Sequence, residues 1–193
     1  RGTGVTTDSS GNIYVTGHTQ GCNSCSTVMA TRGLDGNTNL GYLDIFLVKY
    51  NSSGTKQWTK QLGTSSDDEG NGVSTDSSGN IYVTGYTYGG LDGNTTSGFY
   101  DLFLVKYNSS GTKQWTKQLG TSSSDSGNGV ITDSSGNIYV TGYTLGGLDG
   151  NTNSGSYDMF LVKYNSSGTK QWTKQLGTSK GDYGRSVTTD SSD

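Results

Sequence analysis

Proline, histidine and long apolar runs are scarce in this 193-residue sequence. It has no proline and one histidine, and only 28% of its residues are hydrophobic, against the roughly 45–50% apolar residues usual for globular proteins. A thick apolar core is therefore excluded. Because no apolar run approaches the ~20 residues that cross a bilayer, we expect no membrane insertion.

Charge of one sign is scarce as well. Thirteen Lys and Arg residues stand against 16 Asp and Glu residues, which gives a net charge of −3 without a block of like charge. Nucleic acid is bound through a basic patch, so we expect no nucleic-acid partner. An active site needs unlike groups gathered in one pocket, and the only imidazole is His18. We therefore expect no enzyme and no cofactor.

Glycine and tyrosine are abundant instead. The chain has 32 Gly and 13 Tyr, a composition rich in turns and flat aromatic surfaces. Helices are penalised by glycine and by β-branched Thr and Val, whereas strands accept Thr, Val and Tyr. The composition predicts an all-β protein.

A repeat of 57 residues organises the chain. Residues 70–126 and 127–183 align without a gap and are identical at 49 of 57 positions. The first copy has eleven extra residues, and the chain runs on past the third copy into a sequence that restates its start. The predicted units are residues 2–69 with an insert at about 20–32, 70–126, 127–183, and 184–193 as the start of a further repeat.

Each unit carries four segments with strand character, separated by turn signals. The third is apolar on both faces, as in a strand inside a stack of sheets, and the fourth is Lys-rich, as at an exposed sheet edge. A four-stranded antiparallel meander of this kind is typical of a β-propeller blade. In the second copy the predicted strands are residues 72–76, 81–87, 102–107 and 112–119.

Three motifs of the unit carry a family resemblance. The second copy has Asp-Ser-Ser-Gly-Asn-Ile-Tyr-Val-Thr-Gly-Tyr-Thr at 76–87, Leu-Asp-Gly-Asn-Thr at 91–95 and Phe-Leu-Val-Lys-Tyr-Asn-Ser-Ser-Gly-Thr-Lys-Gln-Trp-Thr-Lys-Gln-Leu-Gly at 103–120. These resemble the bacterial SBBP β-propeller repeats, found in tandem in large secreted or surface proteins. The resemblance implies a non-enzymatic, extracellular or cell-surface module, and it carries no shared ligand.

Three blades are too few to close a propeller, which typically has four to eight. The sequence leaves three alternatives: a fragment of a longer array, chains that complete one another, or an open stack. An extra copy of the first strand is a donor for strand addition between molecules, which favours self-assembly into a ring or filament. The candidate assembly residues are Val5, Thr6, Thr7, Asp8, Val187, Thr188, Thr189 and Asp190.

The insert of the first copy holds the only two cysteines, Cys22 and Cys25. In an exported protein such a pair favours a disulfide, within one chain or between chains. A soft-metal site with His18 as a third ligand is an alternative, although a closed zinc site needs a fourth. A free redox pair is the third possibility.

The Asp-Gly-Asn loop recurs in every copy, and an Asp directly precedes each third strand. Carboxylate and amide oxygens at short spacing are weak candidates for calcium, and Asx-turns that cap a tight loop explain the same residues. The candidate oxygen ligands are Asp35, Asn37, Asp44, Asp92, Asn94, Asp101, Asp149, Asn151 and Asp158.

Aromatic residues recur in register. Such rows pack successive sheets together where aliphatic residues are few, or they stack against sugar rings on a surface. The first interpretation predicts packing aromatics at Trp58, Trp115, Trp172, Tyr50, Tyr107 and Tyr164, with Tyr14, Tyr82 and Tyr139 in a parallel row.

The leading hypothesis is thus an extracellular structural protein whose partners are other copies of itself. The alternative is a module that binds carbohydrate or another protein.

Overall fold

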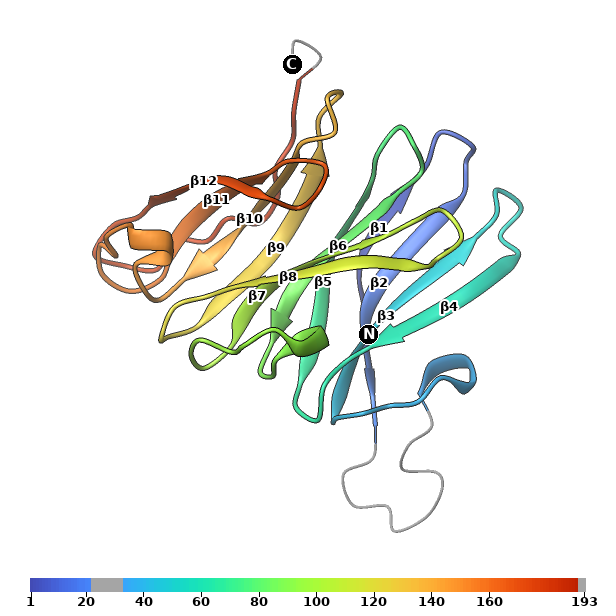
Figure 1. Ribbon diagram of the computed structural model, residues 1–193, viewed down its shortest axis with the longest axis horizontal. Coiled ribbons are helices and arrows are strands. Elements are labelled where there is room, and N and C mark those ends of the chain that lie inside the picture. The colour runs from blue at the N-terminus through green and yellow to red at the C-terminus, as the bar shows by residue number, and fades with distance from the viewer. Residues whose placement is uncertain (22–32, 191–193) are drawn as a thin grey trace.

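The computed structural model of the chain describes residues 1–21 and 33–190. It contains three four-stranded antiparallel sheets, one for each repeat, and no α-helix in this part of the chain (Figure 1). The all-β prediction is confirmed. Blade 1 comprises β1 (Gly2–Thr7), β2 (Ile13–Gln20), β3 (Leu43–Tyr50) and β4 (Lys56–Leu62); blade 2 comprises β5 (Asp68–Thr75), β6 (Ile81–Thr87), β7 (Asp101–Tyr107) and β8 (Lys113–Leu119); blade 3 comprises β9 (Asp125–Thr132), β10 (Ile138–Thr144), β11 (Asp158–Tyr164) and β12 (Lys170–Leu176).

The hairpin turns of each blade follow from the Asp-Ser-Ser-Gly-Asn sequence. In blade 2 the Asp76 carboxylate accepts hydrogen bonds from the backbone N–H groups of Ser78 (3.0 Å) and Asn80 (2.9 Å) and from the Tyr82 hydroxyl (2.9 Å). Gly79 supplies the positive φ of +76° that the turn requires. These turns gather at one end of the blades, which we call the turn end (Figure 1).

The opposite end of the blades, which we call the loop end, carries the longer connections. It contains the β2–β3, β6–β7 and β10–β11 loops and the links from one blade to the next. The short 3-10 turns η2 (Leu34–Gly36), η3 (Leu91–Gly93) and η4 (Leu148–Gly150) belong to the three loops.

The first strands of the blades lie next to one another. β1 is beside β5, and β5 is beside β9. Thr75 donates a hydrogen bond to the Thr7 carbonyl (3.0 Å), and Thr132 donates one to the Thr75 carbonyl (3.2 Å). The approach is close because glycine lies at the contact: a Cβ on Gly72 would be 2.7 Å from the Asn128 carbonyl oxygen. The Lys-rich strands β4, β8 and β12 lie at the other edge of each sheet.

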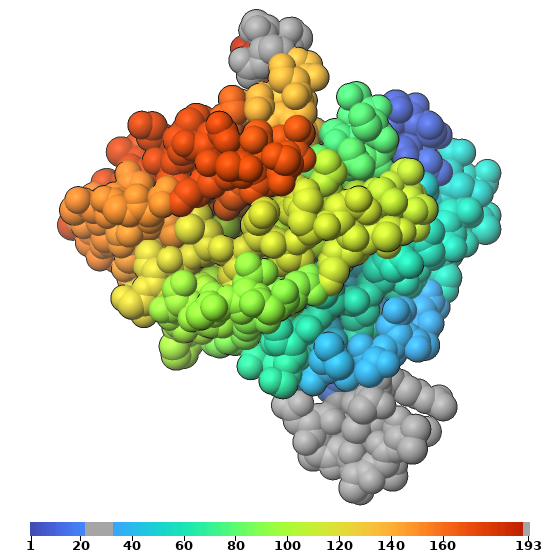
Figure 2. Space-filling view, in the orientation of Figure 1, coloured from blue at the N-terminus to red at the C-terminus, as the bar shows by residue number. Residues whose placement is uncertain are grey.

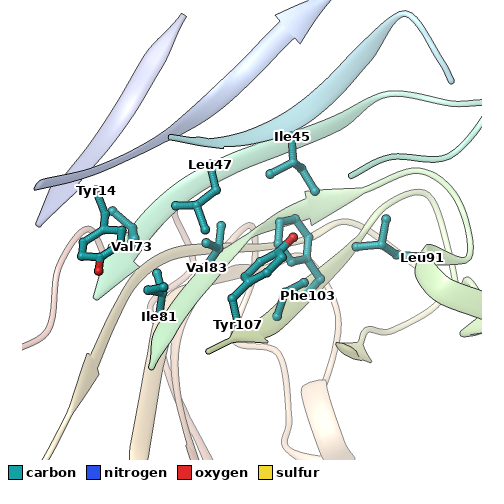
Figure 3. Packing of buried hydrophobic residues seen from close by; sticks show 10 residues of the cluster. Tyr14, Ile45, Leu47, Val73, Ile81, Val83, Leu91, Phe103 and Tyr107 are labelled. Atoms are coloured by element: carbon teal, nitrogen blue, oxygen red, sulfur yellow. The ribbon is translucent and has the colours of Figure 1, made fainter. Parts of the chain in front are cut away.

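The apolar core lies between the blades. Tyr14, Ile45 and Leu47 of blade 1 pack against residues of blade 2 that include Ile81 and Phe103 (Figure 3). A second cluster of the same composition joins blade 2 to blade 3. Figure 2 shows the repeats as successive layers. Each sheet therefore needs a neighbour on both faces to bury its apolar residues.

Two details differ from the strands expected from the sequence. β5 begins at Asp68, four residues before the predicted start at residue 72, because a register shift between Gly70 and Gly72 lets the strand continue pairing with β6. Residues 184–190, expected to begin a further repeat, lie outside any sheet. A strand needs a neighbouring strand, and this segment has none within the described chain.

Candidate functional site

The exposed large apolar side chains of the described residues fall into two groups. Three of the nine occupy positions whose counterparts in other blades are packed in or against the core clusters: Val5, Leu34 and Leu176. The other six lie in loop-end segments away from those clusters: Leu40, Tyr42, Tyr88, Phe99, Leu145 and Tyr183. Clustered exposed apolar residues mark interaction surfaces more often than scattered ones do. The two groups are therefore the two candidate sites.

The leading face is the open face of blade 1, formed by Val5, Val15, Leu34 and Tyr50, with the buried Val48 at the base of a hollow between Leu34 and Tyr50. Its counterparts in the inner blades are covered. Val5 is 68% exposed, whereas Val73 at the same repeat position is 8% exposed. Leu34 is 38% exposed, and its counterpart Leu91 is fully buried. Blade 1 thus presents to solvent the surface through which blades 2 and 3 bind their predecessors.

The trailing face is the open face of blade 3, formed by Tyr139, Leu161, Trp172 and Leu176. Its counterparts on blades 1 and 2 are buried or partly buried at the two internal interfaces: Leu47 and Leu104 are buried, and Leu62 and Leu119 pack against the core clusters. Leu176 is 71% exposed. The trailing face thus presents to solvent the surface through which blades 1 and 2 contact the blade that follows them.

Residues 184–190 sit against blade 3 in the place of a first strand. Asn128 donates a side-chain hydrogen bond to the Gly184 carbonyl (2.7 Å), as Asn71 does to the Gly127 carbonyl one blade earlier (3.0 Å). The Gly184 N–H also donates to the Gly142 carbonyl (3.0 Å). The segment is positioned to be the first strand of a fourth blade.

The candidate assembly residues divide between the two faces. Within β1, Val5 pairs with Val15, Thr6 with Tyr14 and Thr7 with Ile13, while Asp8 holds the following turn. The repeated residues at the other end line a hollow over the trailing face together with Tyr139 and Leu161; they are Val187, Thr188, Thr189 and Asp190.

Buried carboxylates lie at the internal blade interfaces. The Asp68 carboxylate accepts hydrogen bonds from the Thr64 N–H (2.6 Å) and hydroxyl (2.9 Å) and from the Thr87 hydroxyl. Burial raises the pKa of Asp68 to about 6, against these hydrogen bonds, which lower it. Burial also raises the pKa of Asp125, the counterpart one blade later.

The candidate calcium ligands are turned toward protein groups. Asp35, Asp92 and Asp149 have positive φ and pair with Lys56, Lys113 and Lys170 respectively. Asn37, Asn94 and Asn151 donate to the carbonyl at the start of their own turns. Asp44, Asp101 and Asp158 each accept a 3.0 Å hydrogen bond from a glutamine of the edge strand. Within the described residues, no three His, Cys, Asp or Glu side chains are grouped for a metal.

The recurring aromatic rows lie at or near the blade interfaces. Tyr107 and Tyr164 are buried in the two core clusters, and Trp58 and Trp115 pack against those clusters. Tyr50 and Trp172 are the counterparts on the open faces. Tyr14 and Tyr82 are fully buried, so a sugar cannot stack on them.

Cys22 and Cys25 lie outside the described residues, so their pairing stays a prediction. His18, their proposed partner in a metal site, has its Nδ1 3.0 Å from Glu69 Oε2. Burial lowers the pKa of His18, and the nearby Glu69 carboxylate opposes that effect.

A cluster of aromatic rings at the loop end was not found from the sequence. It consists of Tyr86, Tyr88, Phe99, Tyr100, Tyr143, Tyr157 and Tyr183, and we call it the aromatic cluster. Its rings come from loops and strand ends, where no periodicity signals proximity. One signal was available: of the eight positions that differ between the second and third copies, five lie in the loop-end segments, including 88/145 and 99/156, and a sixth, 126/183, is the second residue of β9 in one copy and follows blade 3 in the other.

Comparisons with known proteins agree with this architecture. The SBBP family, described as a beta-propeller repeat, matches residues 1–23, 57–92 and 114–149. The chain is similar to regulatory protein FlaEY of Caulobacter vibrioides, with 26% identity over 170 residues, 77% of this chain and 18% of that protein. It is also similar to the uncharacterized WD repeat-containing protein L264 of Acanthamoeba polyphaga mimivirus, with 27% identity over 227 residues, 92% of this chain and 16% of that protein.

The chain thus spans less than a fifth of the length of either relative. The first family match covers β1 and β2 of blade 1, and each of the other two runs from the last strand of one blade through the first two strands of the next. Each blade has the four-stranded antiparallel meander of a propeller. The chain therefore belongs to the SBBP family of β-propeller repeats.

Proposed function

We propose that the protein is a non-enzymatic structural repeat protein that assembles with other copies of itself, head to tail, through its open blade faces. The observation that supports this most directly is that apolar side chains exposed on the outermost blades are covered at the same repeat positions inside the chain. Leu34 and Leu176 are exposed on the outermost blades, and the residues at the same repeat positions lie in or against the core clusters inside the chain.

The two faces are complementary because the repeats are nearly identical. Blade 1 binds blade 2, and blade 2 binds blade 3, through clusters of matching composition. The trailing face of one molecule and the leading face of another present the same two surfaces that meet at each blade interface inside the chain. Contact of this heterologous kind propagates into a filament or closes into a ring. Two molecules together carry six blades, within the range in which propellers close.

The segment at residues 184–190 provides a way for two molecules to join, by strand exchange. It occupies the position that β1 of the next molecule would need on the trailing face. Residues 187–192 have the same sequence as residues 5–10, so this segment can replace β1 beside β2 of the neighbour in the same register. Exchange of identical elements between molecules is a low-cost route to assembly.

We also propose that assembly takes place outside the cell or at the cell surface. The support is the resemblance to tandem repeats of secreted proteins and the closely spaced cysteine pair, which suits an oxidising environment. Labelling of intact cells with an antibody against the chain tests this: surface labelling is expected, and labelling only after permeabilisation contradicts it.

Two variants that block opposite faces test the assembly. Leu34→Asp places a charge on the leading face, and Leu176→Asp places one on the trailing face. Both side chains are exposed in the single molecule, so folding should be unaffected, which circular dichroism checks. Light scattering after size-exclusion chromatography should show wild-type assemblies, monomers of each variant alone, and dimers in an equal mixture of the two.

The equal mixture is the decisive sample because each variant retains the face that the other has lost. Leu40→Asp serves as the matched control, since Leu40 is exposed at the loop end and should leave assembly intact. A monomeric wild type, or variants that assemble as well as the wild type, would contradict the proposal.

A further inference from the structure

The aromatic cluster is not explained by assembly through the blade faces. It lies at the loop end, in two groups on adjacent blades. Tyr86, Tyr88, Phe99 and Tyr100 of blade 2 have ring centroids 4.9–6.1 Å apart in their closest pairs. Tyr143 and Tyr157 of blade 3 and Tyr183, in the segment after it, have centroids 5.1–5.4 Å apart. Phe99 is 66% exposed and Tyr88 36% exposed, so ring surface is available to a ligand.

Contacts between the rings hold them in place. The Tyr88 ring packs against the rings of Tyr86, Phe99 and Tyr100, with centroids 5.2–6.0 Å away. The Tyr143 ring packs edge-on against those of Tyr157 and Tyr183. Rings that are already ordered lose little conformational freedom when a ligand binds. The cluster is therefore a preorganised platform.

The charge around the platform favours a neutral ligand. Charges of both signs lie near the described rings: burial and the nearby Asp67 and Glu69 carboxylates raise the pKa of Tyr88, and the Arg185 guanidinium lies 5.3 Å from the Tyr183 ring. The groups bonded next to the rings are neutral: the Phe99 N–H donates to the Ser123 carbonyl (2.9 Å), and the Asn153 side chain donates to the carbonyl of Ser156, the residue before Tyr157 (2.9 Å). Phosphate or sulfate groups would meet no basic patch here.

We propose that the aromatic cluster binds a neutral oligosaccharide, with one sugar ring on the blade 2 rings and the next on the blade 3 rings. Sugar rings present C–H faces that stack on aromatic rings and hydroxyl edges that hydrogen-bond. Tyrosine supplies both an apolar ring and a polar hydroxyl, a combination that suits a half-wetted contact. The two groups of rings on adjacent blades give the site two stacking positions.

Binding of cellohexaose and chitohexaose, measured by isothermal titration calorimetry and by tyrosine fluorescence, tests this proposal with the intact chain. Binding to at least one of them is expected, with little dependence on salt because the ligand is uncharged. Phe99→Ala and Tyr88→Ala should each weaken it about tenfold, the effect of losing one aromatic stacking contact.

Leu34→Ala is the matched control, because it removes an exposed apolar side chain from the leading face and should leave sugar affinity unchanged. Thermal melts confirm that each variant is folded. Failure of the wild type to bind either hexasaccharide overturns the proposal, and so does an affinity of Phe99→Ala and Tyr88→Ala equal to that of the wild type. If those variants lose assembly instead and keep sugar binding, the cluster is an assembly surface and the proposal is wrong.

Discussion

Two buried aspartates at the blade interfaces link the stability of the protein to pH. Asp68 and Asp125 are fully buried carboxylates, each held by the threonine four residues earlier and by a threonine of the adjoining strand. Burial of the charged form is costly even with such hydrogen bonds. The stability of the blade interfaces should therefore depend on pH.

Asp68→Asn should flatten that dependence. The folded pKa of Asp68 is raised to about 6, so its contribution is fully present below the unfolded pKa of about 4 and is lost as the pH rises through about 6. The wild type should lose roughly 2–3 kcal/mol from this group over that range, and the variant should not. Urea unfolding across the range measures the slope, and equal slopes in both proteins would contradict the assignment.

Glycine at the register shift between the first two strands is a second residue-scale constraint. A Cβ on Gly85 would lie 1.8 Å from the Glu69 carbonyl oxygen, whereas one on Gly93 would meet nothing within 4 Å. Gly85→Ala should cost about 3 kcal/mol through overpacking. Gly93→Ala, at φ +81°, should cost only about 1–2 kcal/mol through strain. Denaturant melts compare the two; a smaller loss at Gly85 than at Gly93 would refute this account.

At the scale of elements, local signals account for most of what could be predicted. The Asp-Ser-Ser-Gly turns and the two-sided apolar run at 102–107 indicated the hairpins and the buried strand, because turn chemistry and alternation act over a few residues. The start of β5 was missed because its four extra residues, 68–71, include Gly70 and pair across a register shift. The aromatic cluster was missed because its rings come from strand ends, a loop and the segment after blade 3, which meet only in the folded chain.

The segment at residues 184–190 is the element on which assembly depends. Deleting residues 184–193 should abolish assembly but leave the three blades folded, because the segment belongs to none of their sheets. Size-exclusion chromatography with light scattering gives the mass, and far-ultraviolet circular dichroism reports the strands. A deletion variant that assembles as well as the wild type would show that the segment is no strand donor.

At the scale of the whole molecule, the apolar residues are distributed between sheets rather than within one core. This arrangement follows from the composition: with 28% hydrophobic residues, each blade is a thin layer that relies on its neighbours. Repeat proteins of this kind gain stability mainly from the interfaces between adjacent units. The leading and trailing faces are the two ends of the row of blades, where no neighbouring blade within the described chain covers the apolar residues. The loop end takes no part in these contacts and is free to bind a ligand.

The most direct measurement is a crosslink across the predicted contact between molecules. Inside the chain, Lys49 Nζ lies 3.3 Å from the Ser109 carbonyl and Lys106 Nζ lies 3.2 Å from the Ser166 carbonyl. The same repeat positions on the open faces are Lys163 and Ser52. With Cys22 and Cys25 changed to serine, a chain carrying Lys163→Cys and Ser52→Cys is treated with a short bismaleimide.

A chain with Lys106→Cys and Ser166→Cys in the same background is the control and should crosslink within one molecule. Lys163→Cys with Ser52→Cys should link separate molecules into dimers and longer ladders on a denaturing gel, and neither substitution should do so alone. Monomers alone from the double variant, alongside an efficient internal crosslink in the control, would contradict head-to-tail assembly of the blades.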